Sequence, residues 1–305
     1  MTAHVGGSQN GFAYLNGEIV PLAQARVSVL DRGFLWGDGV YEITPCYGGQ
    51  LFRLEDHLAR LQASLRYVAI NLPLSWRQLA QVTREVVELN KAVTSSSPVC
   101  RVGHWVSRGV EDWRPVSEWV ADPTVSIVVT PDAARSRDDY SQGVLLTVVG
   151  TRRNPSWAIE PRVKVLSKMN QILAELDAGS RGAMALMLDA DGYIAEGSVS
   201  NVFLVRSGQL FTPRVQKILV GITRTVTLEL ASELGMAVVE EDLTAFDLAC
   251  AEEIFLTTSP WGILPVRAVD RFTPTAKVPG PVTVRLMDSL AEKTGFHPLT
   301  GAAWS

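Results

Sequence analysis

Near its start the chain carries two runs in which apolar and polar residues alternate on either side of a glycine-containing turn. In "FAYLNGEIVPL", residues 12–22, the turn is Asn16-Gly17, a dipeptide that favours a two-residue hairpin loop. The run "GVYEITPCYGGQLFRL", residues 39–54, repeats the pattern around Gly48-Gly49. The alternation therefore predicts two β-hairpins.

The pattern then changes to a helical period. Over residues 54–68 four leucines recur on one face, which predicts an amphipathic helix. A second amphipathic helix is predicted over residues 75–90, and strands are predicted over 97–109 and 124–131. The first third of the chain thus combines a sheet with helices.

The chain has a polar interval, "PDAARSRDDYSQG" at 131–143, with little apolar periodicity. Such a stretch is typical of a linker, so we predict a smaller N-terminal domain at 1–130 and a larger C-terminal domain at 144–305. Beyond the linker, strands and helices follow without regular βαβ alternation, which favours an α+β fold over a doubly wound sheet. The predicted elements are a strand at 144–150, a hairpin at 183–197, a strand at 201–205, a helix at 222–235 and a strand at 252–258.

Composition narrows the class of protein. The 305 residues are 47% hydrophobic, enough to bury a substantial core. Charged residues make up 20% and the net charge is −4, which argues against a basic nucleic-acid-binding surface. The scattered cysteines and histidines argue against a disulfide framework or a metal cluster. With no signal-peptide pattern and no long uncharged apolar run, we expect a soluble cytoplasmic protein with no membrane or nucleic-acid partner.

The segment "IEPRVKVLSKMNQILAELDA", residues 159–178, raises the question of which lysine is chemical. Ser167 suits a helix N-cap, which puts Lys168 on the polar side of the helix that follows. Lys164 lies before the cap, between apolar neighbours in an extended segment, and a partly buried lysine is suited to imine formation. The alternative is that Lys164 reaches solvent from an edge. The apolar stripe of the predicted helix consists of Met169, Ile172, Leu173 and Leu176.

The segment "LVGITRTVTLEL", residues 219–230, has the features of an anion site. Gly221 permits close approach of the backbone, and the amides of Ile222 and Thr223 at the helix start would point at the anion. The alternative interpretation is an ordinary helix cap.

Two further polar positions follow predicted strands. Glu196, in "AEGSVSNVFLV", would need a cationic partner or a protonated ring nitrogen if half-buried; the alternative is a surface glutamate. Thr258 and Ser259, in "LTTSPWG", offer hydroxyls that could receive a phosphate.

Seven motifs in order resemble the class IV aminotransferases, pyridoxal-phosphate enzymes of fold type IV. They are "DRGFLWGDGVYE", "HLARLQASL", "RVKVLSKMNQILAELDA", "GYIAEGSVSNVF", "VGITRTV", "EIFLTTSPWGILPV" and "VPGPVT", spread from about Tyr14 to about Leu290. The family includes D-amino-acid and branched-chain aminotransferases, (R)-selective amine transaminases and aminodeoxychorismate lyase. The resemblance implies a smaller α/β N-terminal domain, a larger C-terminal domain with a β-barrel-like core, pyridoxal 5'-phosphate as cofactor and a homodimer.

The resemblance also assigns roles to residues. It makes Lys164 the Schiff-base lysine, Glu196 the carboxylate at the pyridine nitrogen and Arg60, in "HLARL", the arginine on the cofactor phosphate. The remaining phosphate ligands that it implies are Ile222, Thr223, Thr258 and Ser259.

The substrate side of the resemblance is mixed. Tyr41, in "GDGVYE", matches a pocket aromatic and favours D-amino-acid aminotransferases, while Trp36, Trp113 and Trp261 could line the pocket. Those enzymes follow their Arg-Gly turn with an arginine and a histidine that grip the substrate carboxylate, an arrangement missing from "SRGVEDWRPVSEW". Branched-chain enzymes commonly carry a tyrosine where this chain has Met169. The arginines that could grip a carboxylate, each with a structural role as its alternative, are Arg101, Arg108 and Arg114.

The sequence therefore predicts an aminotransferase that exchanges an amino group between an amino acid and a 2-oxo acid. A D-amino acid is favoured, with a branched-chain L-amino acid or an (R)-amine as alternatives. A lyase that releases pyruvate from aminodeoxychorismate is the second hypothesis. A non-catalytic relative is the third, and the presence of Lys164, Glu196 and Arg60 argues against it.

Overall fold

The computed structural model describes residues 11–113, 115, 122–132 and 135–300, and the chain divides into two compact units. The first unit takes the chain up to residue 133 and, separately, Lys164–Ser167. The second takes residues 134–163 and the chain from Lys168 onward. The two lysines in question therefore belong to different units.

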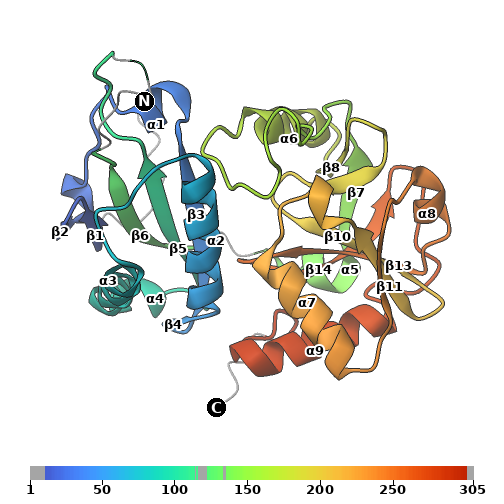
Figure 1. Ribbon diagram of the computed structural model, residues 1–305. Helices are drawn as coiled ribbons and strands as arrows, with labels where there is room; N and C mark the ends of the chain where they lie inside the picture. Colours follow the sequence, from blue (N-terminus) through green and yellow to red (C-terminus); the bar gives the residue numbers. More distant parts are fainter. Residues whose placement is uncertain (1–10, 114, 116–121, 133–134, 301–305) are drawn as a thin grey trace, which may run out of the picture. The chain divides into compact units, whose positions relative to one another are not determined.

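The first unit is built on a six-stranded antiparallel sheet in the order β2-β1-β6-β5-β3-β4 (Figure 1). Both predicted hairpins are confirmed, and Asn16 and Gly17 in the first turn have φ of 49° and 102°, values that Asn and Gly tolerate best. The described strands of this sheet are β1 Phe12–Leu15, β2 Glu18–Pro21, β3 Gly39–Tyr47, β4 Gln50–Leu51, β5 Val99–Ser107 and β6 Val125–Pro131.

Helices α2 and α3 pack on this sheet and confirm the predicted periodicity. The leucine face of α2 is buried, and α3 begins at a capping box in which Ser75 and Gln78 bond each other's backbone amides. The described helices of this unit are η1 Leu22–Gln24, α1 Arg32–Trp36, α2 Leu54–Tyr67, α3 Trp76–Leu89 and α4 Lys91–Thr94.

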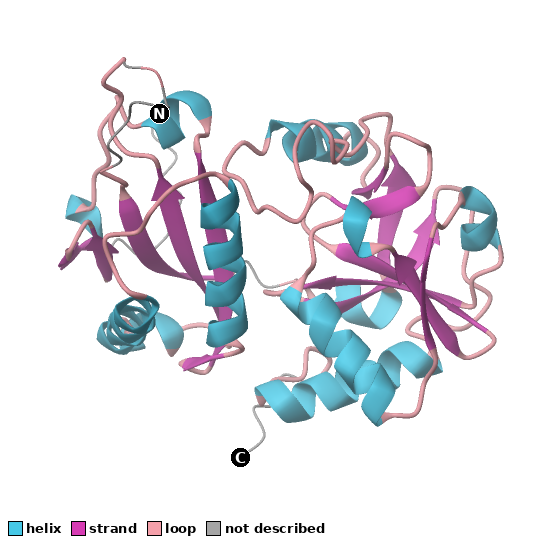
Figure 2. Cartoon of the chain, viewed as in Figure 1, coloured by secondary structure: helices cyan, strands magenta, loops and turns pink. Residues whose placement is uncertain are grey.

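The second unit is built on an eight-stranded mixed sheet in the order β12-β11-β10-β13-β14-β7-β8-β9, which curls so that β9 approaches β10 and β11 (Figure 2). Two separate sheets with helices packed on them, one sheet a curled half-barrel, confirm the predicted α+β fold. The described strands are β7 Val144–Val148, β8 Met184–Leu188, β9 Ile194–Gly197, β10 Asn201–Arg206, β11 Gln209–Pro213, β12 Val238–Glu241, β13 Glu253–Thr258 and β14 Gly262–Val269.

The helices of the second unit differ from the sequence prediction in two places. Part of the predicted linker forms the short helix α5, because Ser136 and Asp139 complete a capping box there. The predicted cap at Ser167 is wrong, since α6 begins after Lys168 without a side-chain cap. The described helices are α5 Arg137–Gln142, α6 Met169–Gly179, η3 Val215–Lys217, α7 Ile222–Glu233, α8 Ala245–Ala249 and α9 Pro281–Thr294.

Helix α6 buries a different face from the one that its apolar residues indicate. Ala174 and Ala178 pack into a core cluster with β8, whereas the predicted stripe faces outward. Met169 and Leu176, for example, are 63% and 66% exposed. Small residues let the helix approach the sheet closely, which leaves the larger apolar side chains outside.

Candidate active site

Lys164 lies on a short extended segment that continues the edge of the first unit's sheet. The amide of Tyr41 donates to the carbonyl of Lys164 at 3.0 Å, and the amide of Leu166 donates to the carbonyl of Gly39 at 2.9 Å. Val165 pairs with Val40 in the same antiparallel ladder. The extended conformation predicted for this segment is thus correct, and Lys164 is half-buried.

The side chain of Lys164 lies beside an aromatic ring. Its Nζ is 4.5 Å from the centroid of Tyr41, within the range of a cation–π contact. The backbone amide of Lys164 donates to Ser64 Oγ at 3.2 Å, so helix α2 fixes this segment. The two residues that sequence reasoning placed near the substrate and the cofactor aldehyde, Tyr41 and Lys164, are therefore neighbours within one unit.

Arg60 projects from the same face of α2 as Ser64, because residues three or four apart share a helical face. Its Nε donates to Glu42 Oε2 at 2.9 Å and its Nη2 to Glu42 Oε1 at 2.7 Å. His57, three residues earlier on the helix, lies 3.0 Å from Glu42 Oε1 through Nδ1. Arg60 is thus held next to a buried carboxylate of β3.

Glu196, at the end of β9 in the second unit, is buried and engaged as an acceptor through both carboxylate oxygens. Its Oε1 accepts from Arg153 Nε at 2.6 Å, and its Oε2 accepts from the amide of Leu219 at 3.0 Å and from Asn201 Nδ2 at 3.3 Å. The cationic partner expected for a buried carboxylate is Arg153.

The start of helix α7 lies close to Glu196 along the chain of hydrogen bonds. Asn201 also donates to the carbonyl of Leu219, two residues before the N-cap Gly221. No side chain of the described residues caps α7, so the amides of Ile222 and Thr223 at its first turn have no intrahelical acceptor. An uncapped helix start with a glycine N-cap suits an anion such as a phosphate.

Thr258 ends β13 in the same unit. Its hydroxyl donates to the carbonyl of Val199 at 2.8 Å, in the loop between Glu196 and Asn201. The loop that contains Thr258 and Ser259 is therefore tied to the loop that follows Glu196. The second unit brings its predicted cofactor ligands into one connected set of loops.

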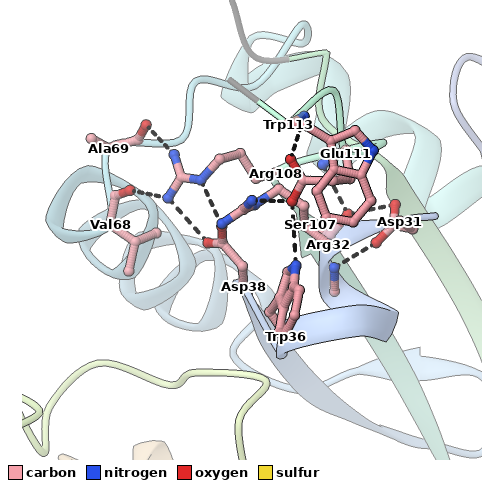
Figure 3. Close-up of polar contacts among 12 residues, drawn as sticks. Asp31, Arg32, Trp36, Asp38, Val68, Ala69, Ser107, Arg108, Glu111 and Trp113 are labelled. Carbon is pink, nitrogen blue, oxygen red and sulfur yellow. Dashed lines mark hydrogen bonds and ion pairs between the residues drawn. The ribbon is translucent and has the colours of Figure 1, made fainter. Parts of the chain in front are cut away.

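Arg108, a predicted carboxylate ligand, has structural partners instead (Figure 3). Its Nε and Nη2 donate to the two carboxylate oxygens of Asp38 at 2.9 and 3.1 Å. Its Nη2 and Nη1 also donate to the carbonyls of Val68 and Ala69 at 2.8 and 3.2 Å, which lie at and just beyond the C-cap of α2. The guanidinium is buried and braces α2 against the end of β5.

Glu111 organises the aromatic side of the same network (Figure 3). Its carboxylate accepts from Arg32, from the indole Nε1 of Trp36 at 3.3 Å and from the amide of Trp113 at 2.8 Å. With these polar atoms satisfied, the two tryptophans remain 60% and 72% exposed. Gly37, next to Trp36, packs so closely on Ser167 that a Cβ there would lie 3.0 Å from it.

The other predicted substrate residues are dispersed. Arg101 forms an ion pair with Asp132, Nε to Oδ1 at 2.8 Å, and its side chain is 42% exposed. Arg114 lies outside the described residues. Trp261, in the second unit, packs its ring under the Arg135 guanidinium at 4.1 Å.

Three functional candidates were not identified from the sequence: Glu42, His57 and Arg153. Glu42 and His57 stand inside or beside the quoted motifs, next to Tyr41 and near Arg60, and the helical spacing of His57 and Arg60 is a signal that could have linked them. Arg153 gives no such signal, because the sequence does not show that it meets Glu196.

The residues of each unit fit the parts of pyridoxal phosphate. The first unit supplies an amine beside an aromatic ring, and the second supplies a buried carboxylate near an uncapped helix start. Among the described helices, none combines the length and the apolar run that crossing a bilayer requires.

Comparison with known proteins agrees with this arrangement. Residues 39–269 match the family model for amino-transferase class IV. The chain is 36% identical over 281 residues to a putative branched-chain-amino-acid aminotransferase of Methanocaldococcus jannaschii, over 92% of this chain and 95% of that protein. It is 29% identical over 276 residues to D-alanine aminotransferase of Bacillus licheniformis, over 90% and 94% of the two chains.

Solved structures share the fold. The branched-chain aminotransferase of Thermoproteus uzoniensis with norvaline has a TM-score of 0.84 and 27% identity, over 93% of this chain and 95% of that one. Another branched-chain amino acid aminotransferase, solved with pyridoxamine 5'-phosphate, has a TM-score of 0.86 and 28% identity, over 94% and 95%. The 4-amino-4-deoxychorismate lyase of Pseudomonas aeruginosa has a TM-score of 0.77 and 30% identity, over 92% and 98%.

Proposed function

Since this chain belongs to the class IV aminotransferase family and is a pyridoxal-phosphate-dependent aminotransferase, we propose that it transfers the amino group of branched-chain L-amino acids to a 2-oxo acid. The observation that carries the choice of substrate is the position of Arg108. A D-amino-acid enzyme would need cations after the Arg-Gly turn to grip the carboxylate, and Arg108 is instead bonded to Asp38 and to two backbone carbonyls. The higher identity to a putative branched-chain enzyme supports the same choice.

The surface beside the Lys164 segment supports an apolar substrate side chain. Trp36 and Trp113 expose their rings while Glu111 accepts from the indole nitrogen of one and the backbone amide of the other. Gly37 packs on Ser167, so Trp36 lies near the strand that carries Lys164. Such a surface favours aliphatic chains, although it discriminates weakly between chains of similar size.

Bound pyridoxal phosphate supplies an electron sink that lets a proton leave the substrate Cα. Lys164 would attach to the cofactor through Nζ and, once released, would move that proton as a base and then as an acid. Tyr41 lies against the ammonium group and limits its directions of approach. The residues proposed to hold the phosphate are Arg60, Ile222, Thr223, Thr258 and Ser259.

Glu196 is proposed to accept from the cofactor's ring nitrogen. Its carboxylate is fixed by Arg153, Asn201 and the amide of Leu219, so it cannot rotate away without losing three hydrogen bonds. A fixed negative charge at that position would stabilise a proton on the ring nitrogen. The arrangement is therefore suited to electrostatic support of the reaction.

A D-amino acid is the second candidate substrate, supported by Tyr41 in "GDGVYE" and by the D-alanine aminotransferase relatives. The lyase alternative is supported by the similarity to 4-amino-4-deoxychorismate lyase. It predicts pyruvate release without a second oxo acid.

We also propose a homodimer, as the family implies. The outward stripe of α6, which includes Met169 and Leu176, leaves apolar side chains exposed on one helix face. A contiguous apolar face of this kind is typical of a protein–protein contact. Sedimentation of the holoenzyme at micromolar concentration would test this, and a monomer would contradict it.

The experiment that tests the function follows the visible absorbance of the lysine-bound cofactor with L-leucine, D-alanine or (R)-1-phenylethylamine in separate cuvettes. We expect L-leucine to discharge the band and 2-oxoglutarate to restore it. Discharge by D-alanine alone would move the second candidate ahead. If none of the three discharges the band and aminodeoxychorismate yields pyruvate, the enzyme is the lyase.

A further inference from the structure

Glu42 is a buried carboxylate that the reaction does not require directly. It has no solvent exposure, and both of its carboxylate oxygens accept hydrogen bonds. Two come from Arg60, one from His57 Nδ1 and one from the amide of Ile43 at 2.9 Å. Because an ionised carboxylate only accepts, Nδ1 of His57 carries the hydrogen.

The charges around Glu42 keep it ionised. Burial alone would raise the pKa of Glu42, but the charge of Arg60 and the hydrogen bonds from His57 and Arg60 hold it well below the usual range. Burial lowers the pKa of His57, and the charges of Arg60 and Lys164 lower it further against the opposing effect of Glu42. The cluster is therefore an ion pair between Glu42 and Arg60, braced by a neutral histidine.

The geometry restricts the Arg60 side chain strongly. An arginine on a helix surface samples many rotamers, and a ligand that needs one of them must select it. The paired bonds to Glu42 fix both the position and the plane of the guanidinium, and Glu42 is itself fixed by β3 and by His57. Such support of a ligand-binding group is the usual way in which a site is preorganised.

We propose that Glu42 is a positioning residue that presents Arg60 to the cofactor phosphate, with His57 orienting Glu42. This rests on the proposed role of Arg60 as a phosphate ligand. The opposite effect is also physically possible, because a carboxylate next to a phosphate-binding arginine offsets part of its charge. The two effects have opposite signs, so an experiment separates them.

The test compares the dissociation constants of pyridoxal phosphate and pyridoxal for the apoenzyme, by absorbance titration. Pyridoxal lacks the phosphate, so the ratio of the two constants isolates the phosphate contribution from the lysine chemistry. For Glu42→Gln we expect weaker binding of pyridoxal phosphate by about tenfold or more, the size typical when a group that orients a ligand is removed. Binding of pyridoxal should stay unchanged.

Glu55→Gln is the matched control, because Glu55 lies on the same helix, has an exposed side chain and undergoes the same change in charge. It should leave both constants unchanged. Tighter binding of pyridoxal phosphate by Glu42→Gln, or equal losses for both ligands, would overturn the positioning role.

Arg60→Ala separates the two proposals. If it lowers the phosphate contribution and Glu42→Gln does not, the positioning role fails and the role of Arg60 stands. If Arg60→Ala leaves the ratio unchanged, both fail. In the double variant, Glu42→Gln should add little to Arg60→Ala, because its effect passes through Arg60.

Glu42→Asp keeps the test informative if Glu42→Gln does not fold, as judged by circular dichroism. Aspartate retains the charge but is one methylene shorter, so it cannot keep both bonds to Arg60. We expect the same selective loss for pyridoxal phosphate. An unchanged ratio in a folded Glu42→Asp variant would contradict the proposal.

Discussion

Glu42 with Arg60 in the first unit and Glu196 with Arg153 in the second are both buried carboxylate–arginine pairs, but they are assembled differently. The side-chain donors to Glu42, His57 and Arg60, stand three residues apart on one helix. The donors to Glu196 come from three separate segments, at Arg153, Asn201 and Leu219.

The difference has a functional side. In the first pair the carboxylate fixes a cation that is proposed to bind the phosphate. In the second pair the cation fixes a carboxylate that is proposed to face the ring nitrogen. The same ion-pair chemistry thus presents a positive group in one unit and a negative group in the other.

The comparison depends on Lys164, because both pairs are proposed to serve the cofactor attached there. Lys164→Ala should abolish the absorbance of the lysine-bound cofactor and lower kcat by about 10⁴-fold, since the variant lacks the base that moves the Cα proton. Lys168→Ala is the matched control and should keep both. If Lys168→Ala loses the band and Lys164→Ala keeps it, the assignment of the lysine is wrong.

Glu196→Gln distinguishes the two pairs directly. It should lower kcat by about a thousandfold, because a neutral amide no longer stabilises a proton on the ring nitrogen. Its dissociation constant for pyridoxal phosphate should change little, whereas Glu42→Gln should change mainly that constant. Stopped-flow kinetics and absorbance titration of both variants provide the check. Unchanged turnover in Glu196→Gln would remove Glu196 from the ring-nitrogen site.

The same comparison explains what the sequence could predict. The hairpins, α2, α3 and the extended segment at Lys164 follow from local periodicity and turn chemistry, which the structure bears out. The pair of Glu42 and Arg60 depends on helical spacing plus one strand, so it was within reach of the sequence. The pair of Glu196 and Arg153 depends on tertiary folding and leaves no local pattern.

Two expectations show where local patterns fail. The apolar stripe of α6 predicts a buried face, but the alanines of this helix pack inward and Met169 and Leu176 remain exposed. A stripe indicates that a face will be covered and does not say by what. Arg108 was expected to be available for a substrate because its partners, Asp38 and the end of α2, are distant in sequence.

The interior around the first pair should make that unit sensitive to acid. Burial lowers the pKa of His104 to about 4 against an ordinary value of 6.5, opposed by Glu42 and assisted by His57. The unfolded chain therefore binds the proton first as pH falls. The contribution of His104 to stability is complete above pH 6.5 and is lost between pH 6.5 and 4, by roughly 3 kcal/mol.

Urea unfolding followed by circular dichroism between pH 8 and 4 measures this loss. His104→Gln should flatten the dependence, because glutamine does not titrate and can still bond Thr83, which lies 2.9 Å from His104 Nε2. An equally steep dependence in the variant would show that other groups cause the acid sensitivity.

The smallest effect is expected at Arg101, whose pair with Asp132 is the exposed counterpart of the buried pairs. The Arg101 side chain is 42% exposed, so water screens the interaction, and Arg101→Gln should lower the free energy of unfolding by about 1 kcal/mol or less. The KM for L-leucine should not change, because Arg101 is bonded to Asp132 rather than presented to a substrate. Arg108→Gln, which breaks a buried pair, is the contrasting variant and should cost about 3 kcal/mol. A tenfold rise in KM in Arg101→Gln, with stability unchanged, would instead return Arg101 to the substrate site and weaken the argument that exposure and partners decide the role of each arginine.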